Sequence, residues 1–281
     1  MSAVTARQLR FGAELRKLRE RAGLNATEAA GHLGMRQSQI SNLEAGRIGA
    51  SPERVRALAA LYECTDQPYV DALAAMTGER RGVGWWEGYR ELLPAAWLDL
   101  AELEHHAHTL RGAITVHIPG LLQTPEHARE VFRHAVPALP PPEIEHRVSF
   151  RVKRQRILYA DTATPYQAIV HEAALRIAVG GAAVAGAQLK HLLEMSEHEH
   201  ISVRSIPFSA GAVPGSGQSI YYAHGPVPQL DTVHLDQSHG LSFLDAEPQL
   251  DKYRTLFERL ETIALSPART RQMIHAIARN L

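Results

Sequence analysis

The chain has 281 residues, which is long enough for two domains that each have a core. Its 30 Lys and Arg residues balance 30 Asp and Glu residues, and residues 1–81 hold a slight basic excess of 12 against 9, which fits a nucleic-acid partner without establishing one. A single cysteine excludes an internal disulfide, and no apolar run approaches the roughly 18 residues of a membrane span. We therefore expect a cytoplasmic protein with no membrane partner.

Residues 1–76 are predicted to form a compact bundle of five short helices. Phe11, Leu15 and Leu18 recur with the period of one helix face. Asn25 with Glu28 forms a capping-box pattern, and Ser51 followed by proline is a strong helix start. The expected helices cover residues 5–22, 26–33, part of 35–47, about 51–62 and 66–76.

The segment Met35–Arg47, MRQSQISNLEAGR, has the pattern of a DNA-recognition helix. Burial of Ile40 and Leu43 would leave a short, uncharged, hydrogen-bonding face outside, whereas a solvated face would carry Lys and Glu. Base edges in the major groove display both donors and acceptors, so such a face suits them. The candidate DNA-contacting residues are Arg36, Gln37, Ser38, Gln39, Ser41, Asn42 and Arg47. The alternative is a helical bundle that binds only protein partners.

The stretch LRKLRERAGLNATEAAGHLGMRQSQISNLEAGR resembles the helix-turn-helix of the Xre/lambda-repressor-like family over about 70 residues. The resemblance implies that Arg19 pairs with Glu44 and ties the first helix to the recognition helix. Two positions depart from the family pattern. Ala26 stands where a glutamine often contacts a phosphate, and Arg36 stands where a serine or threonine usually caps the recognition helix.

Residues 77–84 are predicted to be a linker, and residues 85–281 a C-terminal α+β domain in which helices enclose a small sheet. Trp85 and Trp86 are expected to anchor a core or an interface. Helices are predicted at 94–110, 124–135, 143–159, 184–199, 249–265 and 267–278. Strands are predicted at 114–118, 166–171, 201–206, 219–224 and 232–235.

The helix predicted at 143–159 carries one arginine stripe, Arg147, Arg151 and Arg154. It indicates either a candidate anion- or ligand-binding site or arginines that face solvent or pair with acids elsewhere in the domain. No catalytic constellation is readable, so we expect no enzyme, no catalytic residue and no cofactor. The best metal-ligand candidates lack a supporting spacing, and we expect no metal. These candidates are His105, His106, His108, His198 and His200.

The segments IPGLLQTPEHAR, RVKRQRIL, HEAALR, IPFSAGAVPG and YRTLFERLETIALSP resemble the uncharacterised C-terminal domain of many actinobacterial regulators with an Xre-type head. The resemblance implies a transcription regulator and a small acidic partner protein. We expect a protein that binds double-stranded DNA as a homodimer, with a C-terminal domain that dimerises or binds an unknown small ligand or partner. The alternative is an antitoxin-like module whose main role is binding the acidic partner.

Overall fold

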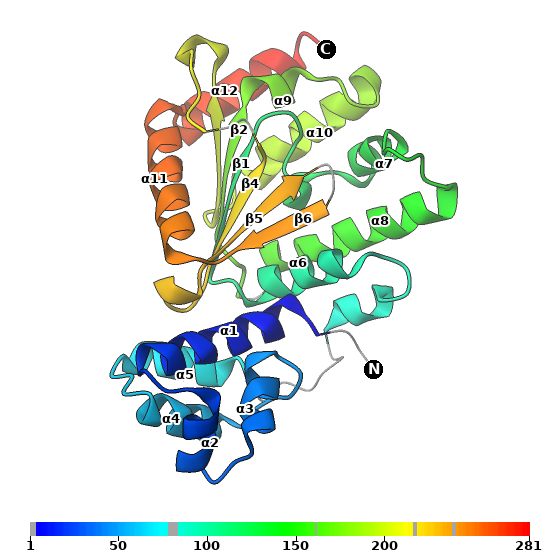
Figure 1. Cartoon of the computed structure of the whole chain (residues 1–281). Helices are drawn as coiled ribbons and strands as arrows, with labels where there is room; N and C mark the ends of the chain where they lie inside the picture. Colours follow the sequence, from blue (N-terminus) through cyan, green and yellow to red (C-terminus); the bar gives the residue numbers. More distant parts are fainter. Residues whose placement is uncertain (1–3, 78–83, 161, 216–217, 238–239) are drawn as a thin grey trace. The chain divides into compact units, whose positions relative to one another are not determined.

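The computed structural model describes residues 4–77, 84–160, 162–215, 218–237 and 240–281 (Figure 1). Contacts divide the chain into two compact units, Met1–Arg90 with Pro94–Leu103, and Glu91–Leu93 with Glu104–Leu281. The first unit therefore includes residues 85–90 and 94–103, which the sequence analysis assigned to the C-terminal domain. Residues 78–83 of the predicted linker lie outside the described residues.

The five predicted helices of the first unit are present, and side chains cap four of their N-termini. They are α1 (Ala6–Arg21), α2 (Ala26–His32), α3 (Gln37–Glu44), α4 (Pro52–Leu61) and α5 (Gln67–Ala75). The capping side chains belong to Thr5, Asn25, Ser51 and Asp66, and each accepts a hydrogen bond from a backbone N–H of the first turn. Because each cap satisfies donors that the helix leaves open, the start of each helix is fixed locally.

A short 3₁₀ helix, η1 (Trp85–Tyr89), and most of α6 (Ala95–His106) complete the first unit. Trp86 and Tyr89 are buried, which confirms that Trp86 anchors a core. Asp99 on α6 accepts a hydrogen bond of 3.0 Å from the Ala6 N–H at the start of α1. A carboxylate at this position also interacts favourably with the positive end of the helix dipole.

The second unit is built on a six-stranded mixed sheet in the order β3-β2-β1-β4-β5-β6. The strands are β1 (Thr109–Ile114), β2 (Tyr166–His171), β3 (Ile201–Ile206), β4 (Ile220–His224), β5 (Thr232–Gln237) and β6 (Gly240–Leu244). β1, β2 and β3 pair in parallel, and β1, β4, β5 and β6 pair antiparallel. The predicted α+β class is confirmed, with the N-terminal helical region followed by this sheet and its helices.

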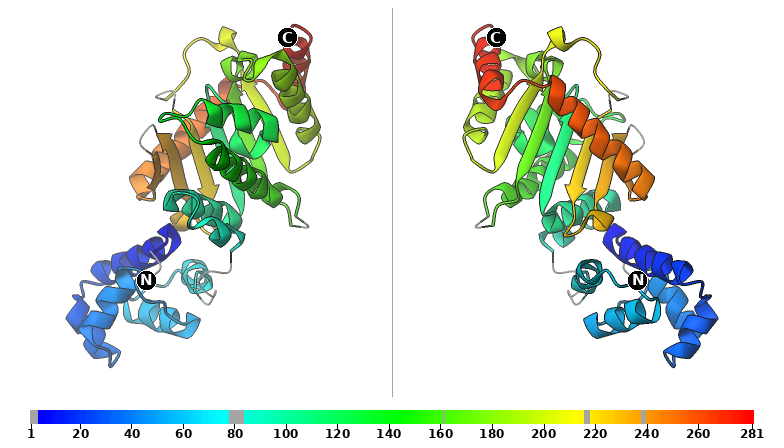
Figure 2. Two further views of the ribbon diagram at one scale, coloured as in Figure 1. Left: turned by 90° about the vertical axis from the view of Figure 1, so that its right-hand side faces the viewer. Right: turned by 90° about the vertical axis from the view of Figure 1, so that its left-hand side faces the viewer.

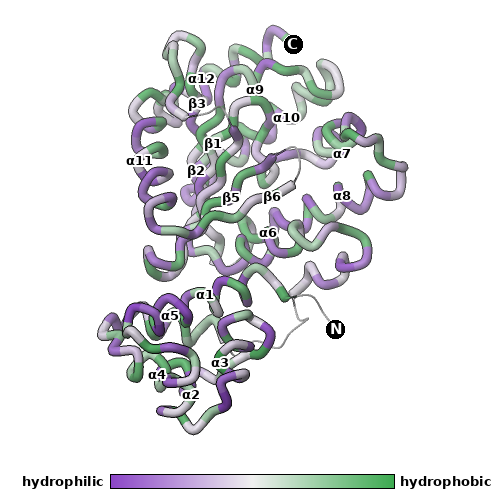
Figure 3. Tube along the Cα trace, in the orientation of Figure 1, coloured by the Kyte–Doolittle hydropathy of each residue, from purple (hydrophilic) through white to green (hydrophobic). Residues whose placement is uncertain are grey.

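Helices cover both faces of the sheet (Figure 2). α11 lies on one face, and α7 and α8 lie on the other. Along α8 and α11 the trace alternates between hydrophilic and hydrophobic residues, as expected of helices that bury one side (Figure 3). The helices of this unit are α7 (Pro125–Arg133), α8 (Pro141–Arg154), α9 (Glu172–Arg176), α10 (Gly181–Met195), α11 (Glu247–Ile263) and α12 (Pro267–Ala278), with 3₁₀ turns η2 (Gly120–Leu122), η3 (Gln155–Leu158), η4 (Phe208–Ala210) and η5 (Pro228–Leu230).

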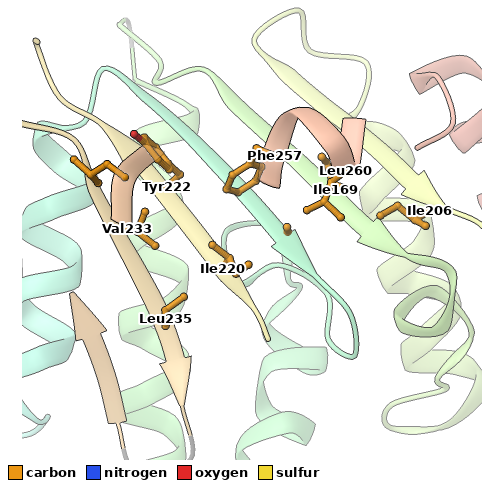
Figure 4. Close-up of a cluster of buried hydrophobic side chains, with 10 residues drawn as sticks. Ile169, Ile206, Ile220, Tyr222, Val233, Leu235, Phe257 and Leu260 are labelled. Carbon is orange, nitrogen blue, oxygen red and sulfur yellow. The ribbon is translucent and has the colours of Figure 1, made fainter. Parts of the chain in front are cut away.

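The core under α11 is apolar (Figure 4). Phe257 of α11 is fully buried among side chains of alternate strand positions, such as Ile220 and Val233. The strand residues of this cluster are Ala113, Ile169, Ile206, Ile220, Tyr222, Val233 and Leu235. Burying an aromatic or branched side chain of this size contributes about 1.5–3 kcal/mol each. This face therefore holds the unit together, and residues one position along each strand face the opposite side.

The predicted positions of β1 and its preceding helix were wrong. The expected helix to residue 110 ends at His106, and the expected strand at 114–118 lies instead at Thr109–Ile114. The Leu110 N–H donates to the Pro165 carbonyl, and the His108 N–H donates to the His224 carbonyl. Pairing on both sides of this central strand overrides the local helical pattern. The edge strand β6 and the five-residue helix α9 were not predicted.

Among the residues that the structure describes, no helix combines the length and apolar character needed to cross a bilayer.

Gly12 sets the approach of α1 to the end of α3. A Cβ atom at this position would lie 2.7 Å from the Leu43 carbonyl oxygen and 2.7 Å from the Glu44 carbonyl carbon, both backbone atoms that cannot rotate away. A Cβ atom at Gly31 in α2 would have no atom from outside its own helix turn within 4 Å. Two glycines within helices of one unit therefore meet opposite surroundings.

We predict that Gly12→Ala lowers the free energy of unfolding by about 1–3 kcal/mol, because overpacking forces α1 away from α3. Gly31→Ala is the control and should raise it by about 0.5–1 kcal/mol through higher helix propensity. Urea denaturation of the full chain measures both. Equal effects of the two substitutions would contradict the close packing at Gly12.

Candidate nucleic-acid interface

One isoleucine and one leucine side chain determine which face of α3 is buried. Ile40 and Leu43 each retain 1% of their accessible surface. Their spacing of three residues places them on one side of the helix, against α1 and α2. The opposite side of α3 is consequently presented to the exterior of the unit.

An ion pair locks the C-terminal end of α3 to α1. Arg19 Nε and Nη2 donate to the two carboxylate oxygens of Glu44 at 2.6 and 2.9 Å, which confirms the pair implied by the family resemblance. Arg19 Nη1 also donates to the Leu24 carbonyl at 2.7 Å, so the same side chain ties down the turn before α2. The hydrogen bond to Glu44 raises the pKa of Arg19 above its ordinary value. The pair is about nine-tenths buried, and its bidentate geometry fixes orientation as well as distance.

Backbone geometry defines both ends of α3. Arg36 is the N-cap residue, and its side chain makes no capping hydrogen bond. The Gln39 side chain supplies the missing contact, because its Oε1 accepts from the Arg36 N–H at 2.9 Å. Gly46 follows the helix with φ of 66°, the left-handed conformation that suits glycine at a helix end. Arg36 is consequently free of a capping role, and Gln39 acts partly as a structural residue.

The exposed face of α3 is polar and uncharged. Gln37 and Ser41 lie one turn apart, and Gln37 Nε2 donates to Ser41 Oγ at 2.7 Å. Arg47 Nη1 donates to Asn42 Oδ1 at 3.5 Å, a long contact that brings the two side chains together after the helix end. Of the seven candidate residues, Arg36, Gln37, Ser38, Gln39, Ser41 and Arg47 are exposed, and Asn42 is half-buried. The structure therefore brings all seven onto α3 and its two ends.

Gly12 belongs to this site although the sequence analysis did not select it. The atoms nearest to a Cβ at this position belong to Leu43 and Glu44, which are not candidate DNA-contacting residues. Gly12 nevertheless determines how closely α1 packs against α3. The available signal was a glycine inside a strongly periodic helix, which costs stability unless close packing requires it.

The arginine stripe of α8 does not form one exposed patch. Arg154 is buried and donates to both oxygens of Glu104 at 2.8 and 2.5 Å, as the paired-arginine alternative predicted. Arg147 lies 3.9 Å from Glu143, and Arg151 donates to Gln123 Oε1 at 2.6 Å. In the described ranges, no three His, Cys, Asp or Glu side chains gather in a way that could hold a metal ion.

We predict that Arg19→Met lowers the free energy of unfolding by about 3–5 kcal/mol, because it leaves the Glu44 carboxylate buried without its partner. The double variant Arg19→Met/Glu44→Met should lose less than the two single variants added together. The control is Arg16→Met, which breaks the exposed pair with Glu20 on the same helix and should cost far less stability than Arg19→Met. Urea denaturation would refute the role of the pair if Arg16→Met and Arg19→Met were equally stable.

Two family models match separate regions of the chain. Residues 10–73 match the model of a helix-turn-helix domain, which indicates a DNA-binding regulator. Residues 97–276, more than half of the chain, match the model described as Domain of unknown function (DUF5753). No curated protein and no solved structure matches the chain. The chain belongs to the DUF5753 family and carries a helix-turn-helix domain at its N-terminus.

Proposed function

We propose that this protein is a sequence-specific transcriptional regulator that acts by binding, not by catalysis, and that reads the DNA major groove with α3. The observation that supports this most is the uncharged polar face of Gln37, Ser38 and Ser41 on a helix held by Arg19 and Glu44. A face that only contacted solvent would usually carry Lys and Glu, whereas contact with base edges requires short hydrogen-bond donors and acceptors.

The proposed contacts fall into two classes. Gln37 and Asn42 carry amides, which pair bidentately with adenine in the major groove. Arg36 and Arg47 lie at opposite ends of α3 and are placed to meet phosphates on either side of the groove. Phosphate contacts set the register of α3, and the amides then select the sequence.

We propose the Xre/lambda-repressor-like subtype for the head, supported by the Arg19–Glu44 pair that the resemblance implied. The C-terminal domain is proposed to dimerise the chain and to receive a signal from a small ligand or a small acidic partner protein. One head presents one short recognition helix, which covers too few base pairs to select a site among many non-specific ones. A two-fold pair of heads would read an inverted repeat.

The sheet of the second unit supports a dimer through β6. Both β3 and β6 are edge strands. On β3, the Ser205 carbonyl accepts from the Leu265 N–H at 2.8 Å and the Ser205 N–H donates to Thr270 Oγ1 at 2.9 Å, so this edge is partly covered. On β6, the described residues show no backbone hydrogen bond outside the sheet. An uncovered edge is a template for pairing with another strand, including that of a second copy.

We predict that Gln37→Ala and Asn42→Ala each cost about 1–3 kcal/mol of binding to the preferred site and change the motif recovered by binding-site selection. Arg36→Gln and Arg47→Gln should instead weaken binding to all sequences and reduce the salt dependence by about one released ion each. The matched control is Arg56→Gln on α4, whose arginine pairs with Asp71 and should leave both quantities unchanged. An unchanged motif in the Gln37 and Asn42 variants would mean that this face does not read bases.

We predict a dimer at micromolar concentration and half-sites centred roughly 34–36 Å apart, or at multiples of this spacing. Sedimentation measures the mass, and footprinting measures the symmetry of the site. Hydrogen exchange should slow in residues 241–244 as the protein concentration rises, whereas β3, whose edge is already covered, should show no change. A monomer over this concentration range, or a site without half-site symmetry, would contradict the dimer.

A further inference from the structure

The two faces of the sheet in the second unit differ in chemistry. The α11 face is an apolar cluster, as described above. On the α8 face, strand positions offset by one residue carry Tyr166, Tyr221 and His234. Gln123 before α7 and His127 of α7 are buried in this unit, and Arg151 of α8 is half-buried. We call this group the α8-face cluster; it comprises Gln123, His127, Arg151, Tyr166, Tyr221 and His234.

Of the three arginines of the stripe, Arg147 and Arg154 each have a carboxylate within ion-pair distance. Among the described residues, Arg151 has none. Arg154 and Glu104 neutralise one another. Arg151 Nη1 donates to the neutral amide oxygen of Gln123, and its guanidinium carbon lies 4.5 Å from the centre of the Phe132 ring. Burial lowers the pKa of Arg151 to about 10, so it remains protonated at neutral pH. A half-buried charge of this kind favours a counter-charge.

His127 adds hydrogen-bonding capacity beside this charge. It retains 2% of its accessible surface, and neither ring nitrogen has a partner among the described residues. Burial lowers its pKa to about 4, with further effects from His117 and Arg151, so the ring is neutral at pH 7 and can both donate and accept. The buried Tyr166 hydroxyl and His234 Nδ1 also have no partner in the described residues. Buried polar groups are paired in the great majority of cases, so unpartnered groups on the same face of the sheet as Arg151 indicate a ligand.

Ordered water could satisfy the open nitrogens and hydroxyl, but it supplies no charge to Arg151. Access is present, because Arg151 and Tyr221 each retain part of their accessible surface. His117 and Asp236 are exposed and both interact electrostatically with Arg151, so the cluster lies near the surface. Asp236 and Glu104 also act on Arg151 and would repel a second negative charge. Phe132 and Tyr221 add aromatic surface beside the guanidinium.

We propose that the α8-face cluster binds a small organic monocarboxylate, with the carboxylate on Arg151, a hydrogen bond from His127 and an apolar or aromatic body against Phe132 and Tyr221. A planar guanidinium matches a carboxylate bidentately, and one available positive charge matches a singly charged ligand. This inference rests on the proposed function in one respect, namely that the C-terminal domain receives the signal.

The test uses the full chain at pH 8, where inorganic phosphate is mainly a dianion, with benzoate as the carboxylate probe and phosphate as the more highly charged probe, at concentrations up to about 10 mM and constant ionic strength. Benzoate should raise the melting temperature in a concentration-dependent manner and shift the ring-nitrogen NMR signals of His127. Phosphate should do neither. Stabilisation by phosphate but not by benzoate would overturn the assignment of a monocarboxylate, as would no response to either probe.

Two variants test the residues. Arg151→Gln should require about tenfold or more benzoate for the same stabilisation, because a charged hydrogen bond is lost. His127→Leu should weaken the benzoate response while leaving the melting temperature without benzoate unchanged or higher, because it removes a buried polar group that lacks a partner. The control, Arg133→Gln on α7, removes an exposed arginine and should respond as the natural chain does. An unchanged benzoate response in Arg151→Gln, or a lower melting temperature with an unchanged response in His127→Leu, would overturn the site.

DNA binding is measured on the same samples, so the two proposals fail separately. Arg151→Gln should bind the selected DNA site as tightly as the natural chain when benzoate is absent. If the unsubstituted chain responds to benzoate but binds no DNA site, the proposed regulator is refuted and the proposed ligand site stands. Intact DNA binding with no benzoate response would do the reverse.

Discussion

The ion pair between Arg19 and Glu44 is the constraint on which the arrangement of the N-terminal unit depends. It is bidentate and mostly buried, and the same guanidinium holds the Leu24 carbonyl before α2. Gly12 also lets the backbone of α1 approach the end of α3 closely. Breaking the pair would leave a buried charge, so α3 has one favoured orientation on α1. That orientation buries Ile40 and Leu43 and exposes Gln37 and Ser41, which gives the proposed reading face a fixed geometry.

The sequence was informative where structure depends on neighbours in the chain. Helix starts at Asn25 and Ser51 and the end at Gly46 follow from capping chemistry that acts within four residues, and the structure confirms them. It was less informative where partners are remote. The strand at Thr109–Ile114 is set by β2 and β4, whereas its own residues also fit a helix. The edge strand β6 has one neighbour and a weak pattern. The spacing of the α8 arginines showed a stripe, but only the fold shows that Glu104, fifty residues earlier, neutralises Arg154 and not Arg151.

The two faces of the sheet in the C-terminal unit differ in chemistry. Phe257 and its neighbours make an apolar layer under α11, so that face needs no further partner to be stable. The opposite face buries His127 and partly buries Arg151, and buried polar atoms without a partner cost stability. Such groups are tolerated where function requires them, and a ligand that binds only the folded state returns the lost stability. Under the proposed monocarboxylate site, binding would raise the stability of the domain without altering the apolar face.

Methylation interference on a selected DNA site separates the proposed entry of α3 into the major groove from binding in the minor groove. Methyl groups on guanine N7 project into the major groove, whereas methyl groups on adenine N3 project into the minor groove. We expect that N7 methylation within each half-site abolishes binding of the full chain and that N3 methylation at the same half-site is tolerated. Binding that survives N7 methylation throughout the site and fails on N3 methylation would contradict it.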